Sequence, residues 1–176
     1  MPENASPLLT AWSNFYVMTG SAAAALTGLM FVVITLVTGR EGARSQDGIS
    51  TFSTPTVMHF AAVLLTSAVL CAPWHVLWPA ELSVAIIGVY GVGYVLRILL
   101  RARNLSGYNA DFEDWTWYLA LPFLAYCAVA AGAIGLHFVP GKAFFAIGFG
   151  VVFLIFIGIR NAWDVVTFLA IRGPSP

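Results

Sequence analysis

The chain has 176 residues, of which 60% are hydrophobic and only 9% are charged, and its formal net charge is zero. A soluble globular domain carries about 25% charged residues, so this composition excludes an ordinary soluble domain and indicates a membrane protein. No basic tract is present, so the sequence does not support nucleic-acid binding. We expect a single transmembrane domain that covers residues 1–176.

The first predicted membrane span is Phe15–Thr38, which contains no charged residue. At ~1.5 Å per residue, a helix of this length crosses a hydrocarbon core of ~30 Å. Gly20, Ala24 and Gly28 are spaced four residues apart, so they are expected to share one helix face. Small residues on one face allow another helix to approach closely, so we predict close packing there. No basic segment precedes this span, which favours a retained helix over a cleaved signal peptide.

A short polar region precedes the second apolar segment. Thr54 can cap a helix, and Pro55 suits the first helical position because its missing N–H is not needed there. The sequence therefore predicts that the second span begins at this point. The five predicted spans have these approximate boundaries: 15–38, 56–73, 82–100, 115–138 and 142–172.

Prolines mark two of the joints between spans and one position inside a span. Pro73 and Pro79 are expected to break the chain on either side of the turn into the third span. Pro122 lies inside the fourth span, where it should kink the helix. Pro140 and Gly141 form a predicted tight turn before the fifth span.

The positions of the basic residues predict the orientation, because Lys and Arg concentrate on the cytoplasmic side of a membrane protein. With five spans, Lys142 is the one basic residue on its side. The basic residues on the other side are Arg40, Arg44, Arg97, Arg101, Arg103, Arg160 and Arg172. We therefore predict an all-α bundle of five transmembrane helices with its N-terminus outside and its C-terminus in the cytoplasm.

The second span carries a polar stripe, which consists of Thr56, His59, Thr66 and Ser67. At 100° per residue these side chains fall within an arc of ~100°. One interpretation is hydrogen bonding between packed helices. The alternative is a face that lines a path for water or ions, in which protonation of His59 near neutral pH would affect conduction.

The third span has two contrasting faces. Gly88 and Gly91 lie on one face, where close helix packing is expected. The opposite face carries Tyr90, Tyr94, Arg97 and Arg101. This second face is predicted to point to a partner helix or a polar cavity, although the two arginines can also extend to the cytoplasmic headgroups.

Charged residues of several spans are predicted to meet at the cytoplasmic end. Arg160 and Asp164 are one helical turn apart and can form an ion pair. The candidate polar cluster at this end contains His59, Arg97, Asp114, Arg160 and Asp164.

The sequence offers little support for catalysis or for a cofactor. Cys71 and Cys127 lie far apart in apolar runs, so they are interpreted as packing residues and not as a redox or metal pair. His75 and His137 are expected near the outer ends of two spans, where a bis-histidine haem is conceivable, but single histidines at the interface are common. Because no nucleophile–base pair, phosphate loop or HExxH motif is present, we predict no catalytic residue, metal or cofactor, and a protein that is not an enzyme.

Three strings together resemble a family of small bacterial polytopic inner-membrane proteins: FYVMTGSAAAALTGLMFV at 15–32, FSTPTVMHF at 52–60 and RNAWD at 160–164. The resemblance implies a location in the bacterial cytoplasmic membrane and implies no activity. A weaker likeness to Orai calcium channels lies in TVMHFAAVLLTSAVLCAP of the second span. The Orai pore helix carries an acidic residue for calcium, whereas the first span here carries none, so calcium selectivity is not implied.

Two functions remain open from the sequence. The first is a homo-oligomeric ion or small-solute channel lined by the polar stripe of the second span. The second is an accessory or scaffold protein that binds other membrane proteins through its small-residue helix faces. Both functions have the lipid bilayer as the surrounding medium.

Overall fold

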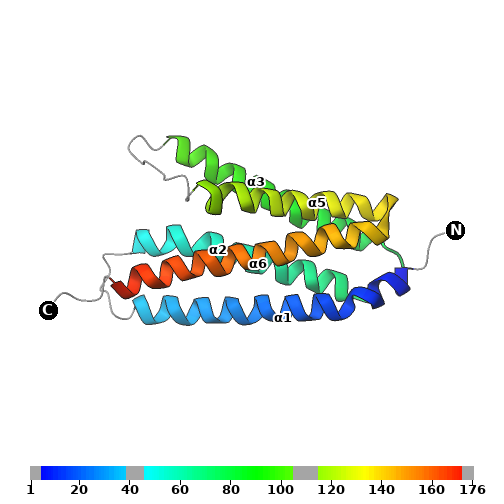
Figure 1. Ribbon diagram of the computed structural model, residues 1–176, viewed down its shortest axis with the longest axis horizontal. Coiled ribbons are helices and arrows are strands. Elements are labelled where there is room, and N and C mark those ends of the chain that lie inside the picture. The colour runs from blue at the N-terminus through cyan, green and yellow to red at the C-terminus, as the bar shows by residue number, and fades with distance from the viewer. Residues whose placement is uncertain (1–4, 39–45, 105–114, 172–176) are drawn as a thin grey trace.

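The computed structural model describes residues 5–38, 46–104 and 115–171, and the described residues form helices joined by short connections. Figure 1 shows these helices packed lengthwise into an elongated bundle, with the start of α1 and the end of α6 at opposite ends. The elements are α1 (Ala5–Thr38), α2 (Gln46–Cys71), α3 (Trp78–Asn104), the π-helical turn η1 (Thr116–Ala120), α5 (Leu121–Phe138) and α6 (Pro140–Ile171). The all-α class predicted from the sequence is therefore confirmed.

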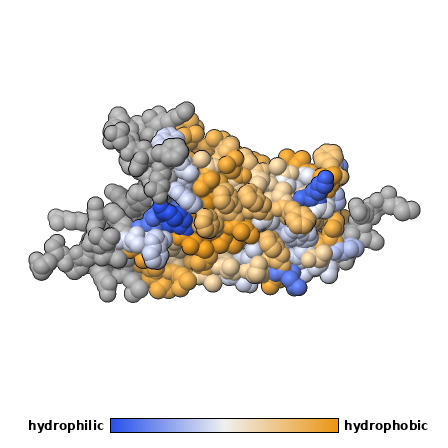
Figure 2. All heavy atoms as spheres, viewed as in Figure 1, coloured by the Kyte–Doolittle hydropathy of each residue, from blue (hydrophilic) through white to orange (hydrophobic). Residues whose placement is uncertain are grey.

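Among the described residues, four helical stretches are long and apolar enough to cross a membrane: Pro7–Thr35, Trp78–Leu100, Thr116–Phe138 and Pro140–Asp164. The apolar part of α2, Pro55–Cys71, is shorter. Large apolar side chains such as Phe31 and Phe145 point outward, and Figure 2 shows an apolar surface across much of the visible face of the bundle. An exposed apolar belt of this extent is unfavourable in water and suits lipid, so the fold is that of a polytopic membrane protein.

The helices are not packed equally tightly. α6 is central to the bundle and contacts α5, α2 and α1, while α1 lies along α2 and α3 lies along α5. α2 and α3 contact each other much less than either contacts its other main neighbour. The α3–α5 pair is therefore held to the rest of the bundle chiefly through α6, and the seam between α2 and α3 is loose compared with the α1–α2 and α3–α5 seams.

The seam that α1 presents to the bundle follows a seven-residue repeat. Leu9, Tyr16, Ala23 and Met30 are all buried, each seven residues after the last. A seven-residue repeat is the pattern of left-handed helix packing, in which the contact line follows 3.5 residues per turn. The predicted packing face with a four-residue spacing is therefore only partly right, because such a face rotates away from a left-handed seam.

The two ends of that predicted face show this rotation directly. Gly20 is buried, and a Cβ atom placed on it would lie 2.9 Å from the Cβ atom of Ser67 on α2. Ala24 is exposed, and a Cβ atom on Gly28 would meet nothing within 4 Å. Gly20 thus packs inside the molecule, whereas Ala24 and Gly28 face outward.

The helix of the second span begins earlier than predicted, although its apolar part, Pro55–Cys71, lies close to the predicted span. α2 begins at Gln46, so Pro55 lies inside the helix and not at its first position. Proline is tolerated inside helices of membrane proteins because neighbouring groups can satisfy the backbone atoms that it frees. α1 also begins earlier than predicted, at Ala5, because Pro7 falls in its first turn, where its missing N–H carries no penalty.

The predicted irregularity near Pro122 takes the form of a π-helical turn. The N–H group of Leu121 donates to the carbonyl of Thr116, five residues back, and α5 then begins with Pro122 in its first turn. A single π turn inside a longer helix widens the backbone locally. The turn predicted at Pro140 and Gly141 is tighter than expected, since Val139 alone separates α5 from α6.

Candidate functional site

The polar stripe of α2 lies in the interior of the bundle. Thr56, His59, Thr66 and Ser67 are each at most 2% exposed. The partners of Ser67 and His59 come from α1 and α5, so this face of α2 is enclosed by other helices. Within the described part of the chain, the stripe therefore does not present an open surface to lipid or water.

Ser67 connects α2 to α1. Its hydroxyl lies 3.1 Å from the hydroxyl of Thr19, which also lies 3.1 Å from the backbone carbonyl of Phe15. A threonine that donates to its own helix still accepts from a neighbour, so both hydroxyl groups can be satisfied. This part of the stripe is a helix–helix contact of the kind that the first sequence interpretation describes.

His59 connects α2 to α5. Its Nδ1 atom lies 3.0 Å from the hydroxyl oxygen of Tyr126. The hydroxyl donates to Nδ1 in one tautomer, and Nδ1–H donates to the hydroxyl in the other. A Cβ atom on Gly91 of α3 would lie 2.0 Å from the ring of Tyr126, so only glycine at this position leaves room for the tyrosine.

Several buried polar atoms near this contact have no hydrogen-bond partner among the described residues. They are Oγ1 of Thr56, Nε2 of His59 and the two amide atoms of Asn161. Phe60 of α2 faces Gly158 of α6, and the two helices are antiparallel. Thr56 and Asn161 therefore each lie about one helical turn from this contact, toward the same end of the bundle. Polar donors and acceptors thus collect in this part of the interior, where each unsatisfied group costs about 1–3 kcal/mol.

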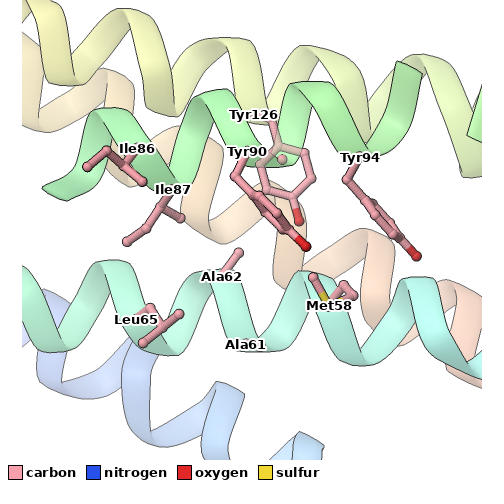
Figure 3. Close-up of a pocket in the computed structure, with 10 residues that line it drawn as sticks. Met58, Ala61, Ala62, Leu65, Ile86, Ile87, Tyr90, Tyr94 and Tyr126 are labelled. Carbon is pink, nitrogen blue, oxygen red and sulfur yellow. The ribbon is translucent and has the colours of Figure 1, made fainter. Parts of the chain in front are cut away.

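A groove lies at the loose seam between α2 and α3, with a cavity volume of about 250 Å³. The residues that line this α2–α3 groove are Met58, Ala61, Ala62, Leu65, Ile86, Ile87, Tyr90, Gly91, Tyr94 and Tyr126. Figure 3 shows the hydroxyl groups of Tyr90 and Tyr126 directed toward α2. Leu65, Ile86 and Tyr90 are each more than half exposed, so the groove opens sideways at the apolar surface of the bundle.

Tyr126 forms the inner wall of the groove and connects it to the buried polar stripe. The tyrosine is 2% exposed, lines the cavity with its ring and contacts His59 with its hydroxyl. Tyr90 and Tyr94 lie close enough to interact electrostatically with this phenol. The structure therefore brings together residues of two predicted sets, the stripe of α2 and the tyrosine face of α3, through a residue that the sequence did not single out.

The predicted charged cluster is present in part. Arg160 and Asp164 form an ion pair, and the guanidinium of Arg160 lies 5.4 Å from the ring centre of Trp117 on η1. Arg97 is exposed, and His59 contacts Tyr126 and not an acidic side chain of the described residues. Asp114 and the side chain of Arg101 lie outside the described residues.

The glycines of α3 lie against α5. A Cβ atom on Gly88 would lie 2.8 Å from the backbone nitrogen of Ala130, and Gly91 faces Tyr126 as described above. These close approaches place the backbone of α3 directly on α5, which turns the opposite face of α3, with Tyr90, toward α2. The two glycines thus position the tyrosines of the groove.

The remaining histidines and cysteines do not form a recognisable ligand set. Nδ1 of His137 lies 3.9 Å from a carboxylate oxygen of Glu81, and His75 is exposed. Cys71 and Cys127 are both free thiols. Over the described ranges, no three His, Cys, Asp or Glu side chains come together in a way that could hold a metal ion.

Sequence reasoning missed Tyr126, Thr19 and Asn161. Tyr126 lies inside an apolar span, away from the membrane interfaces where tyrosine is usually enriched, and this position was the available signal. Asn161 is fully buried on α6, and an amide within an apolar helix was a similar signal. Thr19 offered no comparable signal, since threonine is common in membrane helices and its partner is distant in sequence.

Comparison with protein-family models, curated proteins and solved structures found no match.

Proposed function

We propose that this protein is a non-catalytic binding protein of the bacterial cytoplasmic membrane, which takes a hydrophobic molecule from the bilayer into the α2–α3 groove. The observation that carries the proposal is the groove itself, an apolar cavity that opens sideways at the lipid-facing surface. Small-molecule sites are typically concave and largely apolar, with a few polar groups that set the orientation of the ligand. Tyr90, which lines the groove, can supply such a group here.

The proposal includes a five-span topology with the N-terminus outside. It is supported by the packing of α2 lengthwise against α1 and α6, which are long enough to cross the membrane. Arg97 and Arg160 lie near the C-terminal ends of their spans, whereas Lys142 lies at the start of α6, which corresponds to the opposite end of the bundle. Basic residues gathered at one end are expected on the cytoplasmic side.

Cysteine labelling tests this topology. Cys71→Ala and Cys127→Ala provide a background without native thiols, and Lys142→Cys or Arg97→Cys is then added singly. A membrane-impermeant maleimide applied to intact cells should label position 142, and position 97 only after the membrane is opened. The reverse pattern would contradict the orientation.

Filling the groove tests the binding role. In Ala61→Trp the larger side chain enters the cavity, whereas Ala25→Trp adds the same bulk to an exposed position on α1 and serves as the matched control. Native mass spectrometry after mild detergent extraction should show hydrophobic adducts on the wild-type protein and on Ala25→Trp, and fewer on Ala61→Trp. Equal adducts on all three proteins would place binding elsewhere.

An accessory role through helix packing is a second candidate. The outward position of Ala24 and Gly28 favours it, because small exposed residues on a membrane helix allow another helix to approach closely. A homo-oligomeric channel also remains a proposal, but a conduit lined by the stripe of α2 would require the bundle to open, since the stripe is buried. The mass of the detergent-solubilised complex distinguishes a monomer or a complex with another protein from a ring of identical chains.

A further inference from the structure

The depth of Tyr90 in the membrane is unusual for a tyrosine. The residue lies near the middle of the apolar span Trp78–Leu100, so it is roughly 15 Å along the helix from either end. Tyrosine is enriched at the two interfaces, where its hydroxyl reaches the headgroups or water. At the middle of a hydrocarbon core of ~30 Å, neither is within reach of the phenol.

The hydroxyl of Tyr90 also lacks a hydrogen-bond partner among the described residues. The side chain is 59% exposed, and its hydroxyl forms no hydrogen bond within the part of the chain that the structure describes. A polar group in hydrocarbon is costly unless it finds a hydrogen-bond partner. Since Tyr90 lines the α2–α3 groove, a molecule in the groove is well placed to supply the acceptor.

Two more tyrosines, Tyr94 and Tyr126, line the groove beside Tyr90. Tyr94 lies one turn after Tyr90 on α3 and lines the same cavity, and Tyr126 forms its inner wall. Figure 3 shows the three rings grouped in one part of the groove, while Ile86, Ile87 and Leu65 lie in the other. The groove therefore has an aromatic part with hydroxyl groups and a purely aliphatic part.

We propose that the α2–α3 groove binds a lipid-soluble quinone. An uncharged aromatic head with carbonyl acceptors fits beside the phenols of Tyr90 and Tyr94, and an isoprenoid chain fits against Leu65, Ile86 and Ile87. The inference rests on the proposed function and specifies its ligand class. It concerns binding alone, without electron transfer.

The depth of the site favours a quinone over a phospholipid. The ester carbonyls of a phospholipid lie at the interface, about 15 Å from the middle of the bilayer, and its charged headgroup holds them there. A quinone head carries no charge, so it can enter the hydrocarbon core together with its carbonyl oxygens. Tyr90 needs an acceptor at that depth, which a phospholipid chain does not provide.

The contact between His59 and Tyr126 supports the shape of this site. Tyr126 is held at its hydroxyl by His59 and at its ring by the close approach of Gly91. The inner wall of the groove is thus rigid, which reduces the ordering required when a flat ring packs against it. His59 and Tyr126 are positioning residues in this proposal, whereas Tyr90 and Tyr94 contact the quinone.

Binding is tested with decylubiquinone and the full chain in lipid nanodiscs, with bound probe measured by equilibrium separation. The wild type should bind saturably, and Tyr90→Phe should bind about five- to tenfold more weakly, which is the effect of one lost hydrogen bond. Tyr16→Phe is the matched control, since it removes a phenol hydroxyl that contacts the carbonyl of Phe144 away from the groove. Its affinity should match that of the wild type.

A second probe separates this inference from the proposed function. Decylbenzene has a similar chain and ring but no carbonyl acceptor, and it should bind more weakly than decylubiquinone. Equal affinity for the two probes, or no effect of Tyr90→Phe, would overturn the quinone inference while the binding role of the groove stands. If neither probe binds, and Ala61→Trp leaves the hydrophobic adducts unchanged, both proposals fail.

Discussion

The Nδ1 atom of His59 on α2 lies 3.0 Å from the hydroxyl oxygen of Tyr126 on α5, and both side chains are buried. This contact joins two helices that come from separate parts of the chain. Because α2 and α3 touch so little, the contact helps to hold the α3–α5 pair beside α2. It also fixes the inner wall of the groove.

The first prediction concerns this hydrogen bond. His59→Phe and Tyr126→Phe should each lower the free energy of unfolding by about 1–3 kcal/mol, because each leaves a buried polar atom without its partner. The double variant should lose less than the sum of the two, with a coupling of about 1 kcal/mol. Unfolding in mild detergent measures the stability of the wild type, the two single variants and the double variant. Fully additive losses would show that the contact is energetically unimportant.

A second prediction compares two glycines of α3. Gly91→Ala should displace the ring of Tyr126, which would lie 2.0 Å from the new Cβ atom, and destabilise the protein by roughly 1–3 kcal/mol. Gly93→Ala is the control, because its Cβ atom would meet nothing within 4 Å. Alanine favours a helix over glycine by about 1 kcal/mol, so the control should be neutral or more stable. A similar loss of thermal stability in both variants would contradict this packing.

A third prediction tests the seven-residue seam of α1. Gly20→Leu should force α1 away from Ser67 and lower the melting temperature, whereas Gly28→Leu should leave the folded protomer intact. Size-exclusion chromatography and thermal unfolding in detergent measure both variants. A smaller particle with an unchanged melting temperature for Gly28→Leu would show that another helix packs on that outer face. Destabilisation by both substitutions would instead support the four-residue packing face.

The fourth prediction concerns conduction. Because Thr56, His59, Thr66 and Ser67 are buried between helices, liposomes that contain the protein should show no proton, cation or anion flux above that of empty liposomes. The assay is run at pH 6 and pH 8 on the wild type and His59→Phe. A flux that depends on pH and disappears in His59→Phe would instead favour the channel.

The fold class was predictable because membrane spans depend on long apolar runs, which single-sequence patterns report well. The ends of the helices were less predictable. Thr54 and Pro55 form a good local start signal, yet α2 begins at Gln46, because proline is tolerated inside helices of membrane proteins. The inner seam of α1 was predicted only in part, since Gly20 packs inside the molecule while Ala24 and Gly28 face outward, and Tyr16, Ala23 and Met30 continue the seam.

The candidate site was predictable only in its separate parts. His59 and Tyr90 stood out because polar side chains are rare in membrane spans. Their common neighbour, Tyr126, depends on how α5 packs against α3 and α6, and no spacing within one helix reports a contact between residues 67 positions apart. The groove depends on the small number of contacts between α2 and α3, which is a property of the assembled bundle.

Photolabelling tests the binding role of the groove most directly. The protein in nanodiscs is irradiated with a long-chain hydrophobic diazirine probe, and the labelled residues are mapped by mass spectrometry. If the groove binds hydrophobic molecules, saturable label should concentrate on residues 58–65 and 86–94, and Ala61→Trp should reduce it there. Label spread evenly over outward side chains such as Val17, Phe31 and Phe145, unaffected by Ala61→Trp, would contradict a binding site between α2 and α3.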